Sequence, residues 1–241
     1  MSRFYFPDAI QLKQNYHLPD AAAHHAARVL RLSVGDAITL FDGTGSEYTA
    51  TITFIDKRNV SIHIEACHAI SCESPLHTTL VQGISSGDRM DYTLQKAVEL
   101  GVTHIQPVGC ARSVVKLNDE RANKRRLHWQ NLVIAACEQC GRNIVPQVAP
   151  IVSLQTWLNT PSTSQLRLLF DPDADHTLHT LPRPSTPIAL LAGPEGGFTQ
   201  DEYLAALAAE HTAIRLGPRV LRTETAALAA LSAMQTLWGD F

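Results

Sequence analysis

The chain has 241 residues, of which 45% are hydrophobic and 18% charged, and its net charge is −3. This balance is typical of a globular protein and excludes an intrinsically disordered chain. No apolar stretch approaches the roughly 20 residues that a membrane-spanning helix needs, and the first residues lack the pattern of a secretory signal. We therefore expect a cytoplasmic protein without a membrane segment.

Five cysteines occur at uneven spacing, which favours reduced thiols over a disulfide framework. Cys137 and Cys140 form a C-x-x-C pair, but no second such pair lies at zinc-finger distance. The residues around the pair also have the pattern of a continuous helix. We therefore predict packed thiols and no metal site.

Positive charge is concentrated in one segment, residues 112–126, which holds six basic residues against Asp119 and Glu120. A nucleic-acid binder with a net negative charge must gather its cations locally in this way. Taken alone, however, such a run is more often a solvated helix face than a binding surface. The charge pattern by itself leaves nucleic-acid binding open.

The first seventy or so residues contain short strand-like runs separated by turn signals. The runs are Arg3–Phe6, Ala37–Phe41, Tyr48–Ile55 and Val60–Ala66, and the turns are Asp42–Gly45 and Lys57–Asn59. One helix is expected at Ala21–Leu30, with Asp20 as its N-cap. Many short strands with little helix predict a small β-barrel over residues 1–73.

From residue 77 onward, strand-like and helix-like segments alternate. The apolar strand-like runs are His77–Ser85, His104–Cys110, Leu166–Asp171, Ile188–Ala192 and Ala213–Leu216. Helices are expected from an Asp88 cap to Leu100, from Asn118 to Gly141, from a Thr199–Glu202 capping box to Glu210, and from Thr223 to Leu237. Strands that are apolar throughout and alternate with helices predict a parallel sheet covered on both faces. Residues 74–241 are therefore predicted to form an α/β domain.

In a parallel α/β sheet, ligands bind where strands end and loops lead into helices. Three loops occupy such positions, at residues 171–173, 193–198 and 216–225. The glycines of the second loop would let a flat ligand lie against the backbone, although glycines also serve an ordinary tight turn. Their spacing fits neither a phosphate-binding P-loop nor the dinucleotide fingerprint. An ATPase and a nicotinamide-dependent dehydrogenase are therefore both disfavoured.

Two segments resemble the cofactor motifs of a known family. Leu191–Phe198 (LAGPEGGF) and Leu216–Ala226 (LGPRVLRTETA) are similar to those of the RsmE family of the SPOUT superfamily. Further segments agree: Lys96–Gly101, Arg112–Lys116, Ala136–Arg142, and Val29–Leu32 with Gly35 and Asp36. The resemblance covers nearly the full length in the family's order, with no departure at the motif positions.

The resemblance implies a SPOUT-type parallel sheet with a C-terminal trefoil knot, preceded by a small PUA-like β-barrel, and a homodimer. Periodicity alone predicts an ordinary doubly wound sheet, because knots are rare in proteins. The resemblance also implies the reaction: methylation, with S-adenosyl-L-methionine (SAM), of N3 of uridine 1498 in the 16S ribosomal RNA of the small ribosomal subunit.

The resemblance places SAM between the two motifs. The expected cofactor residues are Leu169, Phe170, Gly193, Pro194, Glu195, Gly196, Gly197, Leu216, Gly217, Val220, Leu221, Arg222, Thr225 and Ala226. Arg222 is the candidate to contact the uracil or stabilise its anion, since guanidinium is a planar and permanently charged donor. Glu224 or Glu195 is the candidate general base, although a glutamate in the first turn of a helix also has an ordinary electrostatic role.

RNA binding is expected, on the same resemblance, from both domains. The candidate contacts are Arg28, Arg31, Arg112, Lys116, Lys124, Arg125 and Arg142. Two alternatives stay open, a SAM-dependent transfer-RNA methyltransferase of the SPOUT class and a non-catalytic RNA-binding assembly factor. The chemistry of the residues alone does not separate uridine from guanosine, or ribosomal from transfer RNA.

Overall fold

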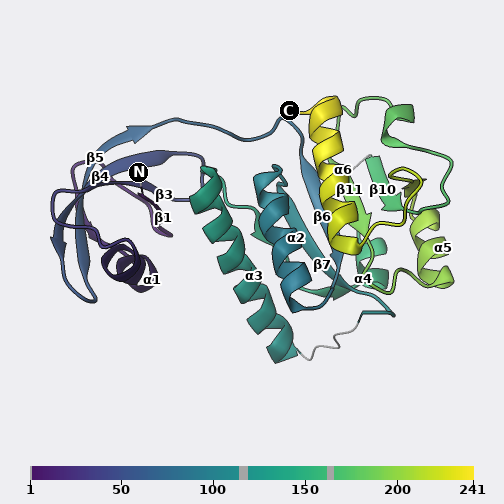
Figure 1. The fold of residues 1–241 in the computed structure, drawn as a ribbon, viewed down its shortest axis with the longest axis horizontal. Coiled ribbons are helices and arrows are strands. Elements are labelled where there is room, and N and C mark those ends of the chain that lie inside the picture. The colour runs from purple at the N-terminus through teal and green to yellow at the C-terminus, as the bar shows by residue number, and fades with distance from the viewer. Residues whose placement is uncertain (1, 114–118, 162–165) are drawn as a thin grey trace. The chain divides into compact units, whose positions relative to one another are not determined.

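The structure, a computed structural model, describes residues 2–113, 119–161 and 166–241 (Figure 1). Lys116, a predicted RNA contact, and Asn118, the expected start of a helix, lie outside these residues. The chain divides into two units. The first contains the residues up to Glu73 together with Cys137–Val145, and the second contains Ser74–Ala136 and Pro146–Phe241.

The first unit is built on a five-stranded sheet with the order β1-β3-β4-β5-β2. Its strands are β1 (Ser2–Tyr5), β2 (Asn15–His17), β3 (Ala37–Phe41), β4 (Glu47–Ile55) and β5 (Val60–His68). β1 and β3 are parallel, and the other pairs are antiparallel. Alternate residues of the strands, such as Ile38, Leu40, Ile62 and Ile64, are fully buried in one core. The sequence missed β2, whose three residues (NYH) carry no apolar alternation.

The helix expected at Ala21–Leu30 differs from the prediction in two respects. It begins one residue earlier, as α1 (Asp20–His24), so that Pro19 occupies the N-cap position and the expected cap, Asp20, lies in the first turn. It then widens into a π-helical turn, His25–Val29. The turn ends before Arg31, whose φ of 54° lies in the left-handed region that non-glycine residues rarely adopt. π-Turns of this kind occur mostly as single insertions within α-helices.

The segment Cys137–Val145 is held to the strands of the first unit by polar contacts. The guanidinium of Arg3 donates to Glu47 Oε2 at 2.6 Å and to Asn143 Oδ1 at 2.7 Å, and Tyr5 N donates to Glu138 Oε1 at 2.9 Å. Arg142 pairs with Glu73, and their side chains are only 4% and 15% exposed. A buried and paired guanidinium has no free face for a phosphate. This placement argues against the predicted RNA contact at Arg142.

Substituting Arg142 by Ala should destabilise the protein by about 3 to 5 kcal/mol, because the Glu73 carboxylate would be left buried without its partner. Urea unfolding followed by circular dichroism measures the loss. The matched control is Lys124→Ala, which removes an exposed ion pair with Glu120 and should cost less than about 1 kcal/mol. Equal stability of the two variants would contradict a structural role for the Arg142–Glu73 pair.

The second unit contains a parallel sheet with the order β12-β10-β11-β6-β7-β8, and β9 pairs with β7 as well. The strands are β6 (Thr78–Gly83), β7 (His104–Gly109), β8 (Gln147–Val148), β9 (Val152–Ser153), β10 (Leu166–Phe170), β11 (Ile188–Ala192) and β12 (Thr212–Ile214). Every pair among them is parallel. The predicted parallel α/β sheet is therefore confirmed, whereas the two-residue strands β8 and β9 were too short to predict.

Helices cover both faces of this sheet (Figure 1). They are α2 (Gly87–Glu99), α3 (Asp119–Cys140), α4 (Leu154–Leu158), α5 (Gln200–Ala208) and α6 (Thr223–Trp238), with a 3₁₀ turn at Leu178–Thr180. Val81, Leu169 and Leu191 pack with residues of α4 and α5 in one core cluster. The alternate strand residues are buried on the opposite face, where α2 and α6 lie side by side. Within the described residues, no helix has both the length and the apolarity to cross a bilayer.

The ends of these helices follow the predicted signals in most places. Gly101 and Gly141 have φ values of 81° and 89°, as helix-stopping glycines require. Thr199 and Glu202 form the predicted capping box at the start of α5. The expected cap of α2 is wrong by two residues, because Ser86 is the N-cap and Asp88 lies inside the first turn. The Ser86 side chain makes no capping hydrogen bond and donates instead to a carboxylate from another part of the chain.

Candidate functional site

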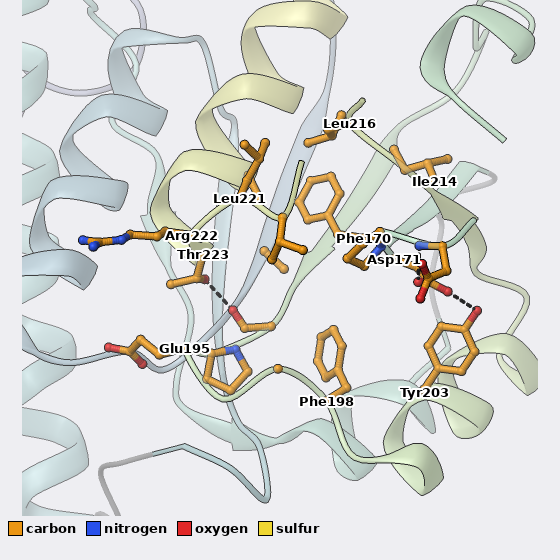
Figure 2. Close-up of a pocket in the computed structure, with 18 of the residues that line it drawn as sticks. Phe170, Asp171, Glu195, Phe198, Tyr203, Ile214, Leu216, Leu221, Arg222 and Thr223 are labelled. Atoms are coloured by element: carbon orange, nitrogen blue, oxygen red, sulfur yellow. Dashed lines mark hydrogen bonds between the residues drawn. The ribbon is translucent and has the colours of Figure 1, made fainter. Parts of the chain in front are cut away.

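A cavity of about 610 Å³ opens at the C-terminal ends of β10, β11 and β12, within the usual size of small-molecule sites (Figure 2). Ten of the fourteen predicted cofactor residues line it: Phe170, Gly193, Pro194, Glu195, Gly197, Leu216, Val220, Leu221, Arg222 and Ala226. The other four do not. Because side chains alternate along a strand, Leu169 points into the core beneath α4 and α5 while Phe170 reaches the cavity. Gly196, Gly217 and Thr225 lie outside its lining.

The predicted loops at residues 193–198 and 216–225 are joined at one fully buried side chain, Gln82, at the end of β6. Its amide nitrogen donates to Thr223 Oγ1 at 3.0 Å and lies 3.4 Å from the carbonyl oxygen of Gly193. Thr223 Oγ1 donates in turn to the same Gly193 oxygen, a contact drawn in Figure 2. The loop after β11 (residues 193–198, the glycine loop) and the start of α6 are thus held to the end of β6. Sequence reasoning missed Gln82 because a polar residue in an apolar strand gives no sign of its partners.

Gly83, the next residue, allows the glycine loop to approach the strand closely. A Cβ atom built there would lie 2.6 Å from the nitrogen and 2.7 Å from Cδ of Pro194, and 2.9 Å from the carbonyl carbon of Gly193. Contacts below about 3 Å cannot be accommodated without moving the backbone. Only glycine therefore permits the observed packing of β6 against the loop.

Gly83→Ala should destabilise the protein by about 1 to 3 kcal/mol, because the new methyl group must displace the backbone of residues 193 and 194. The control is Gly87→Ala, four residues further on, where a Cβ would meet no heavy atom within 4 Å. Gly87→Ala should be neutral or slightly stabilising, since alanine restricts the unfolded chain. Thermal unfolding of the two variants tests the difference, and an unaffected Gly83→Ala would refute the close approach.

One wall of the cavity carries acidic and aromatic groups. Tyr203, from α5, donates its hydroxyl to Asp171 Oδ2 at 2.7 Å, and both residues line the cavity with Phe198 (Figure 2). The hydrogen bond to Asp171, together with partial burial, raises the pKa of Tyr203. This wall therefore carries negative charge from Asp171 beside a neutral phenol. Tyr203 and Phe198 were missed because they look like ordinary apolar residues around the start of a helix.

Arg222 and Glu195 lie on the opposite side, with their side chains extending away from Asp171 and Tyr203 (Figure 2). Glu195 Oε1 accepts hydrogen bonds from Ser86 N at 2.8 Å and Ser86 Oγ at 2.7 Å, and lies 3.5 Å from a guanidinium nitrogen of Arg89. Burial alone would raise the pKa of Glu195, but the hydrogen bonds from Ser86 and the charge of Arg89 outweigh it and lower the pKa. An engaged carboxylate with a lowered pKa is a weak proton acceptor.

Glu224, the other candidate base, follows Thr223 in the first turn of α6 and does not line the cavity. One of its carboxylate oxygens is buried and has no hydrogen-bond partner among the described residues. Its position fits the alternative interpretation, a first-turn carboxylate favoured by the helix dipole. The Oε2 atom of Glu195 is likewise buried without a hydrogen-bond partner among the described residues. In each predicted base, the oxygen that has no partner is therefore shielded from solvent.

Arg112, a predicted RNA contact, holds the glycine loop from outside. Its guanidinium donates to the carbonyl oxygens of Gly196 and Phe198, both at 3.1 Å. Beside it, Ala111 N donates to Glu202 Oε1 at 2.7 Å, while the other oxygen of Glu202 completes the capping box of α5. The end of β7 is thus tied to the glycine loop and to the helix that follows the loop. The structure gives Arg112 this positioning role, which the sequence did not predict.

The remaining predicted RNA contacts lie on the surface of their own units. Arg28 and Arg31 are exposed at the π-helical turn of the first unit, and Lys124 is exposed on α3, where Arg125 is half-buried. These positions leave the side chains accessible, and RNA binding by them stays a prediction. Among the described residues, no group of three or more histidine, cysteine or acidic side chains is arranged to hold a metal ion.

Comparison with known proteins agrees with this geometry. The family model of an RNA methyltransferase domain matches residues 72–235, and that of an RNA methyltransferase PUA domain matches residues 18–65. The ribosomal RNA small subunit methyltransferase E of Buchnera aphidicola (subsp. Acyrthosiphon pisum) is 34% identical over 239 residues, which are 99% of this chain and 94% of the relative. The protein of the same name from Bacillus subtilis is 31% identical over 234 residues, 93% of this chain and 91% of the relative.

The chain belongs to the RsmE family of ribosomal RNA small subunit methyltransferases. Two solved structures extend the similarity to the whole fold of the family. A putative methyltransferase from Legionella pneumophila in complex with SAM has a TM-score of 0.96 and 39% identity, with 99% of this chain and 98% of that one covered. The RsmE protein of Neisseria gonorrhoeae bound to SAM has a TM-score of 0.93 and 48% identity, with 100% and 99% covered. The predicted PUA-like character of the first unit and the SAM dependence of the family are thereby confirmed.

Proposed function

We propose that this chain transfers the methyl group of SAM to N3 of a uridine in 16S ribosomal RNA, uridine 1498 of the small ribosomal subunit. The observation that carries the proposal is the cavity formed by the two motif loops at the ends of β10, β11 and β12. Membership of the RsmE family supports both the cofactor and the substrate class. A ribosomal substrate also supports action in the cytoplasm.

The residues around the cavity fit SAM by size and by chemistry. Phe170, Leu216 and Leu221 supply apolar surface for the adenine, which usually dominates the lining of such sites. Gly193 and Gly197 leave backbone groups accessible to the adenine edge. Asp171, on the acidic wall, suits the positively charged ammonium group at the amino-acid end. When bound, SAM supplies an activated methyl group on a positively charged sulfur.

We further propose the arrangement that the family resemblance implies. Residues 1–73 form the RNA-docking domain and residues 74–241 the methyltransferase domain, with the glycine loop and the loop before α6 in a trefoil knot. The active form is a homodimer that binds 16S RNA in the small subunit without a membrane or metal partner. Arg28, Arg31 and Lys124 are exposed and Arg125 is half-buried; these cations are the RNA contacts that we propose, and Lys116 remains a candidate.

The chemistry requires that the uracil nitrogen and the methyl carbon meet in line at near-contact distance, and such positioning lowers the barrier by several kcal/mol. The cavity holds the target base between its apolar residues and the side occupied by Arg222. N3 of uridine carries a proton that must leave before or during the transfer. Arg222, at the start of α6, stabilises the negative charge that then develops on the uracil.

Filling the cavity should abolish cofactor binding. Ala226→Phe places a ring in the lining from the first turns of α6, and we expect the affinity for SAM in isothermal titration calorimetry to fall by about 100-fold or more. Thr225→Phe is the control, because Thr225 is exposed and lies outside the lining. Circular dichroism establishes that both variants fold. Unchanged affinity in Ala226→Phe would remove the cavity as the SAM site.

The substrate is tested by incubating the protein with labelled SAM and small subunits, or naked 16S RNA, from cells that lack the enzyme. Mapping the methylated nucleotide by mass spectrometry should locate one uridine methylated at N3. Label appearing in transfer RNA instead would favour the alternative SPOUT activity. SAM binding without any methylated product would favour a non-catalytic assembly factor.

Arg222→Ala should retain SAM binding and lose methylation rate by about 100-fold or more, because a charge-stabilising donor acts mainly in the transition state. Single-turnover rates with saturating SAM measure the effect. A variant with full activity would rule Arg222 out of catalysis.

A further inference from the structure

Two helices begin on the same side of the cavity, and each brings an arginine to it. Arg222 is the N-cap residue of α6, and Arg89 lies in the first turn of α2. Both line the cavity. Arg222 and Glu195 lie on the side away from Asp171 and Tyr203 (Figure 2), and Arg89 lies 3.5 Å from Glu195. The N-terminal ends of the helices carry partial positive charge, which adds to that of the two guanidinium groups. This side of the cavity is therefore suited to a negatively charged group.

Glu195 fixes the first turn of α2. Its Oε1 atom accepts from both Ser86 N and Ser86 Oγ and lies 3.5 Å from the guanidinium of Arg89. Because Glu195 belongs to the glycine loop, α2 and Arg89 are held against the same loop that forms the cavity. The side chain of Arg89 is nevertheless 42% exposed. A guanidinium has five N–H donors, so that its contact with Glu195 leaves donors for a ligand.

The proposed reaction places a negative charge near this side. Loss of the N3 proton leaves a uracil anion whose charge is shared by N3 and the two adjacent carbonyl oxygens. The described carboxylates that line the cavity are Glu195, Asp171 and Asp173. Glu195 Oε1 is engaged by Ser86 and Arg89, while its Oε2 is buried and has no partner among the described residues. Asp171 accepts from Tyr203 on the wall opposite Arg222 (Figure 2), and Asp173 N donates to Asp171 Oδ1 at 2.9 Å. On the side of Arg222, the cavity therefore provides cations that can stabilise the uracil anion rather than a free carboxylate that could accept the N3 proton.

We propose that Arg89 is a second catalytic arginine, which binds the uracil anion together with Arg222, and that Glu195 is a positioning residue for Arg89 rather than the general base. This proposal rests on the proposed function. The N3 proton passes to solvent water, and the N3 lone pair attacks the methyl carbon. The carbon–sulfur bond breaks with its electron pair retained by sulfur, which becomes neutral, and the methylated uracil is neutral as well. The two arginines favour ionisation of N3 and so lower the pKa of the bound uridine.

The test measures single-turnover methylation of small subunits, at saturating SAM and saturating subunits, between about pH 6 and pH 10. For Arg89→Ala we expect unchanged SAM affinity and a rate about 100-fold lower at neutral pH. The deficit should shrink as the pH rises, because hydroxide then performs the ionisation that the arginine no longer favours. Arg89→Lys should recover part of the rate. Arg183→Ala removes an exposed arginine away from the cavity and should match the wild type.

Two results would overturn the role of Arg89. A deficit of equal size at every pH would show that Arg89 does not act on N3 ionisation. A raised KM for the subunit with unchanged kcat would show that Arg89 contacts an RNA phosphate instead. Failure of the wild-type protein to bind SAM or to methylate any RNA would refute the proposed function itself, and calorimetry with the wild type separates that outcome from the effect of Arg89.

The role of Glu195 has its own test. If Glu195 positions Ser86 and Arg89, Glu195→Ala should slow methylation while Glu195→Gln recovers most of the rate, because the amide oxygen still accepts from Ser86. If Glu195 were the general base, glutamine would be as inactive as alanine, and the acidic limb of the pH profile would disappear in both. The second outcome would overturn the positioning role.

Discussion

The buried amide of Gln82 is the contact on which the cavity depends. Through it, the end of β6 holds both Gly193 and Thr223, which belong to loops 30 residues apart in the chain. A buried polar group of this kind stabilises a structure only where its hydrogen bonds are made, and it specifies one arrangement when they are. The glycine loop also needs Gly83, since any larger residue would displace it. The site is therefore defined by the strand beneath it as much as by the two loops that contain the motifs.

The sequence predicted the α/β sheet, most helix ends and most of the cavity, because these depend on local signals. Apolar strands, the Thr199 capping box and the glycines after β11 act within a few residues of the chain. Some of the failures involve contacts between residues far apart in the chain. Ser86 occupies the N-cap position of α2 in place of Asp88, and its N and Oγ atoms donate to Glu195, 109 residues away in the chain. Long-range partners of this kind leave no periodic trace in the sequence.

The predicted arginines also depend on partners that are distant in the sequence. Arg142 and Arg112 look like surface cations in the sequence, yet one is buried against Glu73 and the other holds the carbonyl groups of the glycine loop. Arg89, which has no motif around it, lines the cavity instead. Arg112 nevertheless stays exposed, and Arg142 lies outside the basic segment 112–126. Both arginines of the electropositive side of the cavity, Arg89 and Arg222, come from outside the basic segment.

Glu202 shows how tightly the site is connected to its surroundings. One of its carboxylate oxygens caps α5 at Thr199, and the other receives the amide of Ala111 at the end of β7. A single side chain thus closes the start of a helix and fixes a neighbouring strand end. In local opening these two segments should behave as one cooperative unit, because neither can leave the carboxylate without exposing the hydrogen bonds of the other.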